Sequence, residues 1–406
     1  MAKDKNGKEL PKGISWLTKK NLYMARFQYQ GQSYTMYAKT LREAKKLLAD
    51  KKYEVEHGIN GKADKTTLNE WFSIWIETYK KGKVKATTLD TYMRIYNNHV
   101  REALGNRYIS KIKTVHIQRF YNDFHDEGFS AKYLETLNAM LSNLFKKALE
   151  SDLIFKNPCV GVVRPSEVKK ERRVLSAFEH TELSSFIMRE EYGEIEPVIT
   201  VLLGTGLRIG ELLGMKWSDI DMDGEQKTLS VERTLVRLKD MDSGEYRFTL
   251  QPPKTKLSHR TIPLQSSVVN ALKRQRKNQN YLKISGKWNP DNEFEGLVFT
   301  GVTGNPLWRS MVTEKLNAIV KAYNKEESEK ASMDGRKPFI MAHLHPHCFR
   351  HSFATRCLEA GIQPKVVQAW LGHSDIAITL NLYSHVDMEL SMANMKILED
   401  SLKKVV

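Results

Sequence analysis

Cysteine is scarce in this chain of 406 residues, which contains only Cys159, Cys348 and Cys357. Their spacing fits neither a zinc site nor a disulfide framework, so we expect a protein of a reducing cytoplasm. Long apolar runs are also missing, because no segment approaches the roughly 18 apolar residues of a membrane span. The N-terminus is rich in lysine and lacks the apolar segment of a signal peptide. The sequence therefore predicts a protein that is neither exported nor inserted into a membrane.

Acidic residues are too few to balance the basic ones. The chain has 48 Asp and Glu against 64 Lys and Arg, which gives a formal charge of +16 and a pI near 9.4. This excess favours a polyanionic partner, although a merely basic soluble protein stays an alternative. Residues 1–60 carry thirteen basic and six acidic side chains, and residues 61–165 carry seventeen and eleven. We expect non-specific contacts with phosphate in these two segments.

The first part of the chain, assigned to residues 1–62, has the pattern of a small sheet followed by a helix. Aromatic-rich stretches at 14–17, 22–29 and 33–37 predict three strands, with a break at 19–21 and a glycine-centred turn at 30–32. Thr40 and Glu43 have the spacing of a capping box for a helix that ends near His57. A basic module of this kind is a plausible DNA reader; a folding appendage or a dimerisation patch is the alternative.

In residues 63–165 the apolar residues recur at the spacing of a helix. Thr67 and Glu70 form a second capping box, and we predict helices from Thr67 onwards, over 87–104, over 114–126 and over 130–149. Together they predict a compact bundle of four helices. The aromatic stripe of the first helix is assigned to the core rather than to base stacking; its members are Leu68, Trp71, Phe72, Trp75, Ile76 and Tyr79. The lysines at 80, 81, 83 and 85 suit either a phosphate backbone or a solvated loop.

The charged segment 163–173 contains Pro165 and has no apolar period, so the linker is assigned to residues 166–174 and the third part to residues 175–406. This part is predicted to be helical with one strand insertion. The stretches 227–237 and 246–264 predict a bent hairpin, broken by Asp242-Ser-Gly244 and by Pro252-Pro-Lys254. Lys254 is placed at the tip of the second turn, where a long cation can swing into a site. Taken alone, it is a surface lysine.

Two arginines suit an attack on a phosphodiester. Arg208 lies in a Thr-Gly-Leu turn that opens a helix over 209–215, and Arg350 lies in His347-Cys-Phe-Arg350-His351. A phosphodiester repels nucleophiles, so cations must be fixed where its equatorial oxygens gain charge, and guanidinium offers paired donors that stay protonated. Removing one preorganised donor costs about 10²- to 10³-fold in rate. Each arginine taken alone would be a surface ion pair.

Histidines lie on both sides of Arg350 in the sequence. His347 and Arg350 are three residues apart and so share a helix face, with roughly 5 to 6 Å between their β-carbons. His373, in Leu371-Gly-His373-Ser-Asp, follows the glycine that ends a helix over 365–371 and is a third donor. The histidines at 343, 345, 347 and 351 invite a metal interpretation. We reject it because Cys-Phe-Arg stands where a zinc hydrolase places its glutamate, and because arginine repels a divalent cation.

Tyr383 is the candidate nucleophile. A phenol is mostly protonated at neutral pH and needs a nearby acceptor and a cationic field. His347 can take the proton, and Lys254 can give one to the leaving 5′-hydroxyl. Neither ATP nor a metal is then needed, because a phosphotyrosine ester retains the energy of the broken bond. A tyrosine of this kind considered alone would more often be a packing residue.

These residues together resemble the signature of the tyrosine recombinases, the phage-integrase family. The resemblance rests on Arg208 in Thr-Gly-Leu-Arg-Ile-Gly-Glu, on Lys254 ahead of His-Arg-Thr-Ile-Pro-Leu, on His347-x-x-Arg350, on Leu-Gly-His373 and on Tyr383 ten residues later. All six positions are filled, over about the last 230 residues. The bundle resembles the core-binding domain of the family. The N-terminal sheet more weakly resembles the arm-binding domain of integrases from conjugative transposons and temperate phages.

The resemblance implies a multidomain, mainly α protein with an α+β catalytic domain that closes around DNA. It implies a covalent 3′-phosphotyrosyl intermediate, strand exchange through a Holliday junction in a homotetramer, and integration and excision of a mobile element. Double-stranded DNA is the implied partner, at core sites and at arm sites, with an excisionase and host DNA-bending proteins as further candidates. The apolar stripe over 387–406 is expected to pack on a neighbouring subunit or on its own domain. A type IB topoisomerase and a non-catalytic DNA-binding regulator are the rival functions.

Overall fold

The computed structural model describes residues 2–4, 7–29, 31–56, 65–165, 173–240, 244–253, 258–380 and 395. The chain divides into two compact units, Met1–Lys169 and Lys170–Val406. The predicted boundary at residues 62 and 63 falls inside the first unit and lies outside the described residues. It stays a prediction.

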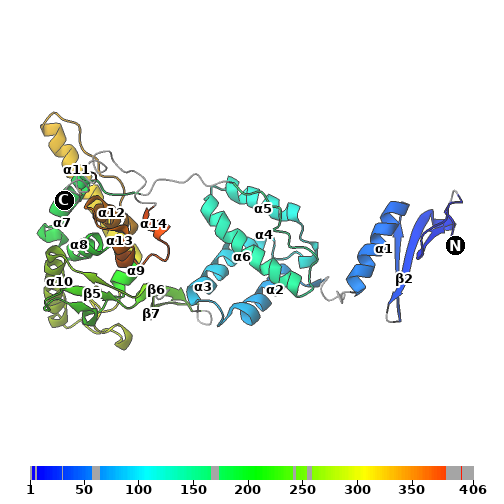
Figure 1. Ribbon diagram of the computed structural model, residues 1–406, viewed down its shortest axis with the longest axis horizontal. Helices are drawn as coiled ribbons and strands as arrows, with labels where there is room; N and C mark the ends of the chain where they lie inside the picture. The colour runs from blue at the N-terminus through cyan, green and yellow to red at the C-terminus, as the bar shows by residue number, and fades with distance from the viewer. Residues whose placement is uncertain are drawn as a thin grey trace, which may run out of the picture. The chain divides into compact units, whose positions relative to one another are not determined.

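The first unit begins with a three-stranded antiparallel sheet. Strands β1 (Ile14–Leu17), β2 (Leu22–Tyr29) and β3 (Gln32–Ala38) pair in the order β1-β2-β3, and helix α1 (Leu41–Glu56) packs on β2 and β3 (Figure 1). The sheet and its following helix are confirmed. The small core between them consists of Leu10, Ile14, Tyr23, Ala25, Ala38, Ala44 and Leu48.

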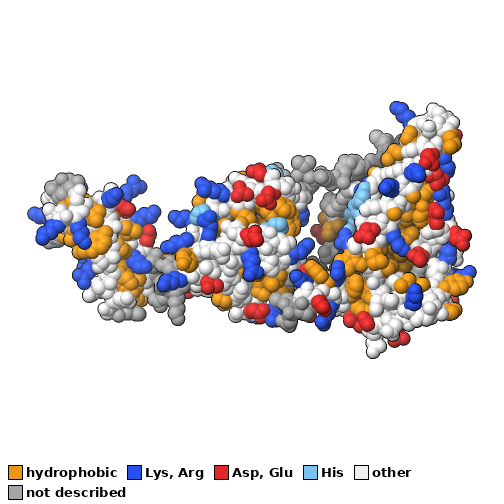
Figure 2. All heavy atoms as spheres, turned by 180° about the vertical axis from the view of Figure 1, so that it is seen from behind, with side chains coloured by type: hydrophobic (Ala, Val, Ile, Leu, Met, Phe, Trp, Pro, Cys, Tyr) orange, Lys and Arg blue, Asp and Glu red, His pale blue; other side chains and the backbone are white. Residues whose placement is uncertain are grey.

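The predicted cap of α1 is half right. The Thr40 hydroxyl accepts a hydrogen bond from the Glu43 backbone N–H, as a capping residue does, at 3.2 Å. The Glu43 carboxylate, however, accepts from the backbone N–H of Lys39 instead of that of Thr40. The exposed face of this module is basic. Figure 2 shows Lys and Arg side chains spread over it, with few acidic ones on the face in view.

A helical bundle forms the rest of the first unit. Helix α2 (Leu68–Ile74) continues as a π-helix over Trp75–Lys80, and helix α3 (Ala86–Ile95) continues as a second π-helix over Tyr96–Val100 and the short α4 (Arg101–Ala103). Helices α5 (Thr114–Asp126) and α6 (Ala131–Glu150) complete it. The capping box of Thr67 and Glu70 is confirmed. The helical stretch predicted over 87–104 is confirmed, and its π-helical middle lies where Tyr96 stacks on Phe72 with 3.6 Å between ring centroids.

The aromatic stripe of the first helix is core, as predicted. Leu68, Trp71, Phe72, Trp75 and Ile76 are buried among the inward residues of α5 and α6, and Tyr79 packs against them. The lysines after the stripe contact protein groups, and Lys83 donates to the Thr78 carbonyl at 2.9 Å. Lys80 donates to the Asn143 side chain and lies over the Trp75 ring, while Lys81 pairs with Glu77. The phosphate interpretation of these lysines stays a prediction.

The second unit is a helical domain around a central apolar helix, α8 (Glu196–Thr205), which packs against α10 (Ser266–Ile284) and α12 (Pro346–Glu359). The domain core includes side chains from all three helices. The described part of this unit also contains α7 (Ala177–Ile187), α9 (Ile209–Leu213), α11 (Arg309–Met333), α13 (Pro364–Leu371) and α14 (Ile376–Leu380). The helix predicted over 365–371 is confirmed.

The strand insertion is the bent hairpin that the sequence predicts, because residues 228–231 pair with 260–263 and residues 234–239 pair with 246–251. Strands β4 (Ile220–Asp221), β5 (Thr228–Val231) and β8 (Arg260–Pro263) form one antiparallel sheet, in the order β4-β5-β8. Strands β6 (Thr234–Lys239) and β7 (Tyr246–Gln251) form a separate two-stranded sheet. The chain passes from the first sheet to the second between Val231 and Thr234. Arg233 lies in this connection, and its guanidinium pairs with Asp219.

Within the described ranges, no helix combines the length and the apolar character needed to cross a membrane.

Candidate active site

The turn between α8 and α9 sets the geometry of the site. Gly206 ends α8 in the left-handed region, with φ of 64°. A β-carbon there would lie 2.5 Å from Cδ1 of Phe353 on α12 and 2.8 Å from Cδ2 of Leu371 on α13. Glycine suits this position, because a β-carbon would force the Phe353 and Leu371 side chains to move and would strain the positive φ. The helix ends therefore meet just before Arg208, the residue that caps α9.

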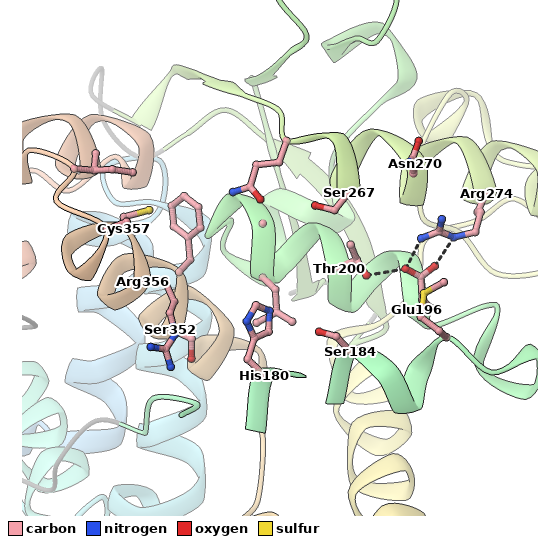
Figure 3. Close-up of a pocket in the computed structure, with 17 residues that line it drawn as sticks. His180, Ser184, Glu196, Thr200, Ser267, Asn270, Arg274, Ser352, Arg356 and Cys357 are labelled. Carbon is pink, nitrogen blue, oxygen red and sulfur yellow. Dashed lines mark hydrogen bonds and ion pairs between the residues drawn. The ribbon is translucent and has the colours of Figure 1, made fainter. Parts of the chain in front are cut away.

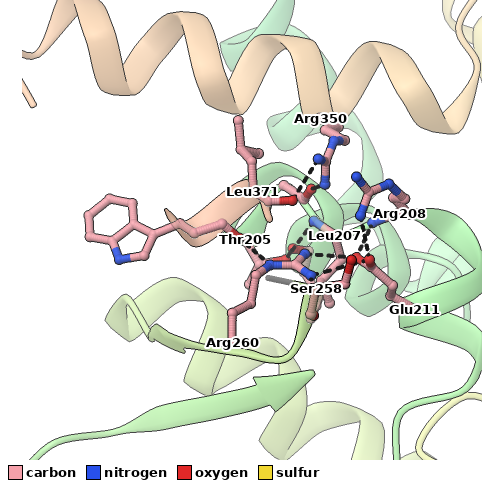
Figure 4. A network of polar contacts seen from close by, with 11 residues as sticks. Thr205, Leu207, Arg208, Glu211, Ser258, Arg260, Arg350 and Leu371 are labelled. Atoms are coloured by element: carbon pink, nitrogen blue, oxygen red, sulfur yellow. Dashed lines mark hydrogen bonds and ion pairs between the residues drawn. The ribbon is translucent and has the colours of Figure 1, made fainter. Parts of the chain in front are cut away.

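Arg208 is held by Glu211, one turn along α9. The Glu211 carboxylate accepts from the Arg208 backbone N–H at 2.9 Å and from its Nη1 at 2.7 Å. The Arg208 side chain is 38% exposed, whereas that of Glu211 is buried. Glu211 also pairs with Arg260 of β8 (Figure 4). Burial raises the pKa of Glu211, but Arg260 and Arg208 outweigh it and hold the pKa at about 2, so the carboxylate is charged.

Arg350 projects from α12 into the space beside Arg208. Its residue is 4% exposed, and its Nη1 and Nη2 donate to the carbonyls of Gly206 and Leu371 at 2.9 and 2.7 Å. Both acceptors stand at helix ends, where carbonyls lack helical partners and favour a cation. Burial and the neighbouring Arg208 lower the pKa of Arg350 to about 9, which leaves it protonated at neutral pH.

His347 lies one turn before Arg350 on α12, near the N-terminus of that helix. It is partly exposed. Burial lowers its pKa, and so do the charges of Arg309, Arg350, His345 and Arg208. The imidazole is therefore neutral at neutral pH, the state in which it can accept a proton.

His373 follows Gly372, which ends α13 in the left-handed region. The residue is 8% exposed, and its Nδ1 lies 2.9 Å from the hydroxyl of the buried Thr379 on α14. Burial lowers the pKa of His373 to about 4, with further contributions from Arg350, Arg208 and Arg260. The ring is neutral at neutral pH; when Thr379 donates to Nδ1, the proton sits on Nε2, which can then donate to a ligand.

The structure thus brings four of the six predicted site residues into one electrostatic cluster: Arg208, His347, Arg350 and His373. Lys254 and Tyr383 lie outside the described residues. Within the described part of the chain, three arginines and one glutamate give the cluster an excess of positive charge, which suits an anionic ligand. Such a site can neutralise a phosphodiester and supply neutral imidazoles for proton transfer.

Two residues of the cluster received no role from the sequence, Glu211 and Arg260. Glu211 stands three residues after its capping residue, which is a recognisable capping-box spacing. Arg260 is the first residue of the short strand β8, and it contacts Glu211, which lies 49 positions earlier in the sequence. No local pattern predicts that contact.

A separate cavity of about 680 Å³ lies on another face of α8 and α12. Figure 3 shows its polar lining, where Arg274 and Thr200 both bind the buried carboxylate of Glu196. His180 of α7 and Ser352 of α12 border the same space. None of the four predicted site residues that the structure describes lines this cavity.

Comparison with known proteins identifies the family of the chain. Residues 173–389 match the phage integrase family, and residues 67–125 match the N-terminal SAM-like domain of phage integrases. A tyrosine recombinase XerC-like protein of Caldanaerobacter subterraneus subsp. tengcongensis is 32% identical, over 86% of this chain and 87% of that protein. The transposase of transposon Tn916 from Enterococcus faecalis is 27% identical, over 86% and 81%.

Solved structures give the same result. The integrase of transposon Tn1549, in complex with a circular intermediate DNA, is 26% identical, with a TM-score of 0.67 over 82% of this chain and 99% of that chain. A lambda integrase dimer bound to a core site is 20% identical, with a TM-score of 0.53 over 92% and 95%, and shares the fold.

These matches show a tyrosine-type site-specific DNA recombinase. The chain belongs to the phage integrase family.

Proposed function

We propose that this recombinase is the integrase of a mobile element, which it integrates and excises by cleaving and rejoining DNA through a covalent 3′-phosphotyrosine. The observation that carries the proposal is the convergence of Arg208, His347, Arg350 and His373 on one positively charged site. The resemblance to the Tn916 transposase and the Tn1549 integrase supports a conjugative transposon or a related element. Its place of action is DNA in the bacterial cytoplasm.

The catalytic roles follow from the charges of the site. Arg208 and Arg350 hold the non-bridging oxygens of the scissile phosphate, and His373 donates a hydrogen bond to the same group. The Tyr383 oxygen attacks phosphorus as its proton passes to His347. The bond to the 5′-oxygen breaks, and Lys254 supplies the proton for the leaving hydroxyl. Rejoining reverses these transfers, so the reaction consumes neither ATP nor a cofactor.

The first 165 residues supply further contacts with DNA. We assign the helical bundle to the core site and the basic N-terminal sheet to a second, arm-type site. A short linker between two DNA-binding modules raises the effective concentration of the second site. The active assembly is a homotetramer on DNA that resolves a Holliday junction, with an excisionase and host DNA-bending proteins as accessory factors. Residues 387–406 pack on a neighbouring subunit; a chain shortened at Asp387 that still forms synaptic complexes would contradict this.

A nicked suicide duplex made from candidate element ends tests the function. The wild-type protein should form a denaturant-resistant adduct with the fragment that ends in the 3′-phosphate at the cleavage site, and Tyr383→Phe should form none. Tyr281→Phe is a matched control, because Tyr281 is 62% exposed on α10. An adduct that survives in Tyr383→Phe would contradict the assignment of the nucleophile. Relaxation of supercoils without any joining of two DNAs would favour a type IB topoisomerase.

A further inference from the structure

Arg260 joins two parts of the active site that come from different elements. From β8 its Nη2 and Nη1 donate to the two carboxylate oxygens of Glu211, at 2.8 and 3.2 Å. Its Nε donates to the carbonyl oxygen of Trp370, in the last turn of α13 (Figure 4). One guanidinium therefore connects the residue that holds Arg208 with the helix end that leads into His373.

The surroundings of Arg260 rule out direct contact with DNA in this conformation. Its side chain is 5% exposed, against 38% for Arg208. Besides Glu211 and Trp370, its Nη1 donates to the Ser258 carbonyl. Its charge and its donors are thus directed at the protein, so any effect on the reaction must act through other residues.

The charge balance explains what Arg260 does for Arg208. A buried carboxylate needs a compensating cation, and Glu211 pairs with both Arg208 and Arg260. Because Arg260 binds both carboxylate oxygens, the Arg208 charge is not consumed by Glu211 and stays available to a phosphate. Without Arg260, Arg208, which already donates to one oxygen of Glu211, would be left as the partner of both carboxylate oxygens.

The second contact acts on His373. Arg260 and Arg350 donate to the consecutive carbonyls of Trp370 and Leu371, at the end of α13. Two fixed cations at a helix C-terminus stabilise its last turn. His373 follows two residues later, so the position of its ring depends on that turn.

We propose that Arg260 is a positioning residue of the recombinase, which neutralises Glu211 so that Arg208 faces the phosphate and which fixes the end of α13 ahead of His373. This inference rests on the proposed function for its effect on rate. It assigns a role to the arginine of the His-Arg-Thr-Ile-Pro-Leu segment, apart from the six catalytic candidates.

Single-turnover cleavage of the suicide duplex tests the role, measured beside DNA affinity and thermal melting. Arg260→Gln should slow cleavage by about 10²-fold, as loss of a supporting residue does, with DNA affinity nearly unchanged. Adding Glu211→Gln to Arg260→Gln should restore about tenfold of the rate, because the uncompensated carboxylate is then gone. Arg260→Lys, which keeps the charge but loses the planar fork, should fall between Arg260→Gln and the wild type.

Arg274→Gln is the matched control, because Arg274 pairs with the buried carboxylate of Glu196 in the same domain, away from the cluster. It should lower the melting temperature and leave cleavage close to wild type. The proposal is overturned when the double variant is no faster than Arg260→Gln, or when Arg274→Gln slows cleavage equally.

A readout that needs no activity separates this inference from the function on which it rests. The charge of Arg260 helps to lower the pKa of His373. The pKa of the His373 ring, measured by NMR titration, should therefore rise in Arg260→Gln and stay in place in Arg274→Gln. An unchanged pKa of His373 in Arg260→Gln contradicts the inference. A wild-type protein that forms no covalent adduct with DNA contradicts the proposed function instead.

Discussion

The guanidinium of Arg350 donates to the carbonyl oxygen of Leu371 at 2.7 Å, across 21 positions of sequence. The same group donates to Gly206, so one buried side chain joins the ends of α8 and α13. The residue assigned to the phosphate is therefore also a structural connection between helices. Its substitution should affect both the reaction and the stability of the domain.

Arg350→Lys tests this double role. A lysine has one nitrogen and cannot reach two carbonyls and a phosphate together. We expect cleavage to fall by about 10²- to 10³-fold. Loss of the buried hydrogen bonds should lower the free energy of unfolding by about 1–3 kcal/mol. Single-turnover cleavage and denaturant unfolding measure the two effects, and Arg356→Lys on the same helix, one-third exposed, should change cleavage only slightly.

Gly206→Ala should be strongly destabilising. The new β-carbon would meet Phe353 at 2.5 Å and Leu371 at 2.8 Å, in addition to the strain of a positive φ. Gly335→Ala is a close control, because Gly335 has the same φ of 64° and open space within 4 Å of the point where a β-carbon would lie. Gly335→Ala should lower the free energy of unfolding by about 1 kcal/mol, and Gly206→Ala should lower it several times as much. Equal losses of melting temperature would show that the close approach is unimportant.

Acid should destabilise the catalytic domain through His373. Its pKa is about 4 in the folded protein, against an ordinary value of 6.5, so the unfolded chain binds more protons between these values. The contribution to stability is complete above pH 6.5 and falls by about 1.4 kcal/mol per pH unit as the pH drops toward 4. His347, whose pKa is also lowered, adds to the loss. Denaturant unfolding at several pH values should show a shallower slope for His373→Gln than for the wild type.

The hairpin of β6 and β7 depends on Trp308, which caps α11. The Arg237 guanidinium lies 3.4 Å from the Trp308 ring centroid and 4.5 Å from that of Tyr246, and Phe248 meets Trp308 edge to face. Trp308→Ala removes both of the contacts made by the indole ring, each worth about 0.5–1.5 kcal/mol. Amide exchange over 234–251 should become faster, while Trp308→Phe should keep most of the protection. Unchanged amide exchange in Trp308→Ala would mean that the backbone hydrogen bonds between β6 and β7 are enough to stabilise the hairpin.

Local patterns predicted much of this molecule. Thr67 and Glu70 marked a helix start that the structure confirms, and the period of Leu68, Trp71 and Trp75 identified a buried face. Those signals extend over a few residues, which is the range over which helical spacing operates. The candidate residues Arg208 and Arg350 came from residue chemistry and family resemblance, and their convergence needed the fold.

The failures were non-local. The bent hairpin of 227–237 with 246–264 was predicted, but strand β4, which pairs with β5 in the same sheet, was not, because no residue near 220 specifies that partner. The contact between Arg260 and Glu211 escaped for the same reason. Strand pairing and buried ion pairs are decided by packing of the whole domain, which a short window does not contain.

The contacts of Arg350 also make the catalytic site depend on the docking of α8 and α13. An unassembled domain, in which the ends of α8 and α13 have not docked, has no acceptors to aim this guanidinium and hence no organised phosphate pocket. A chain in which these helix ends have not docked should therefore be unable to cleave a strand, because Arg350 is then not held in place.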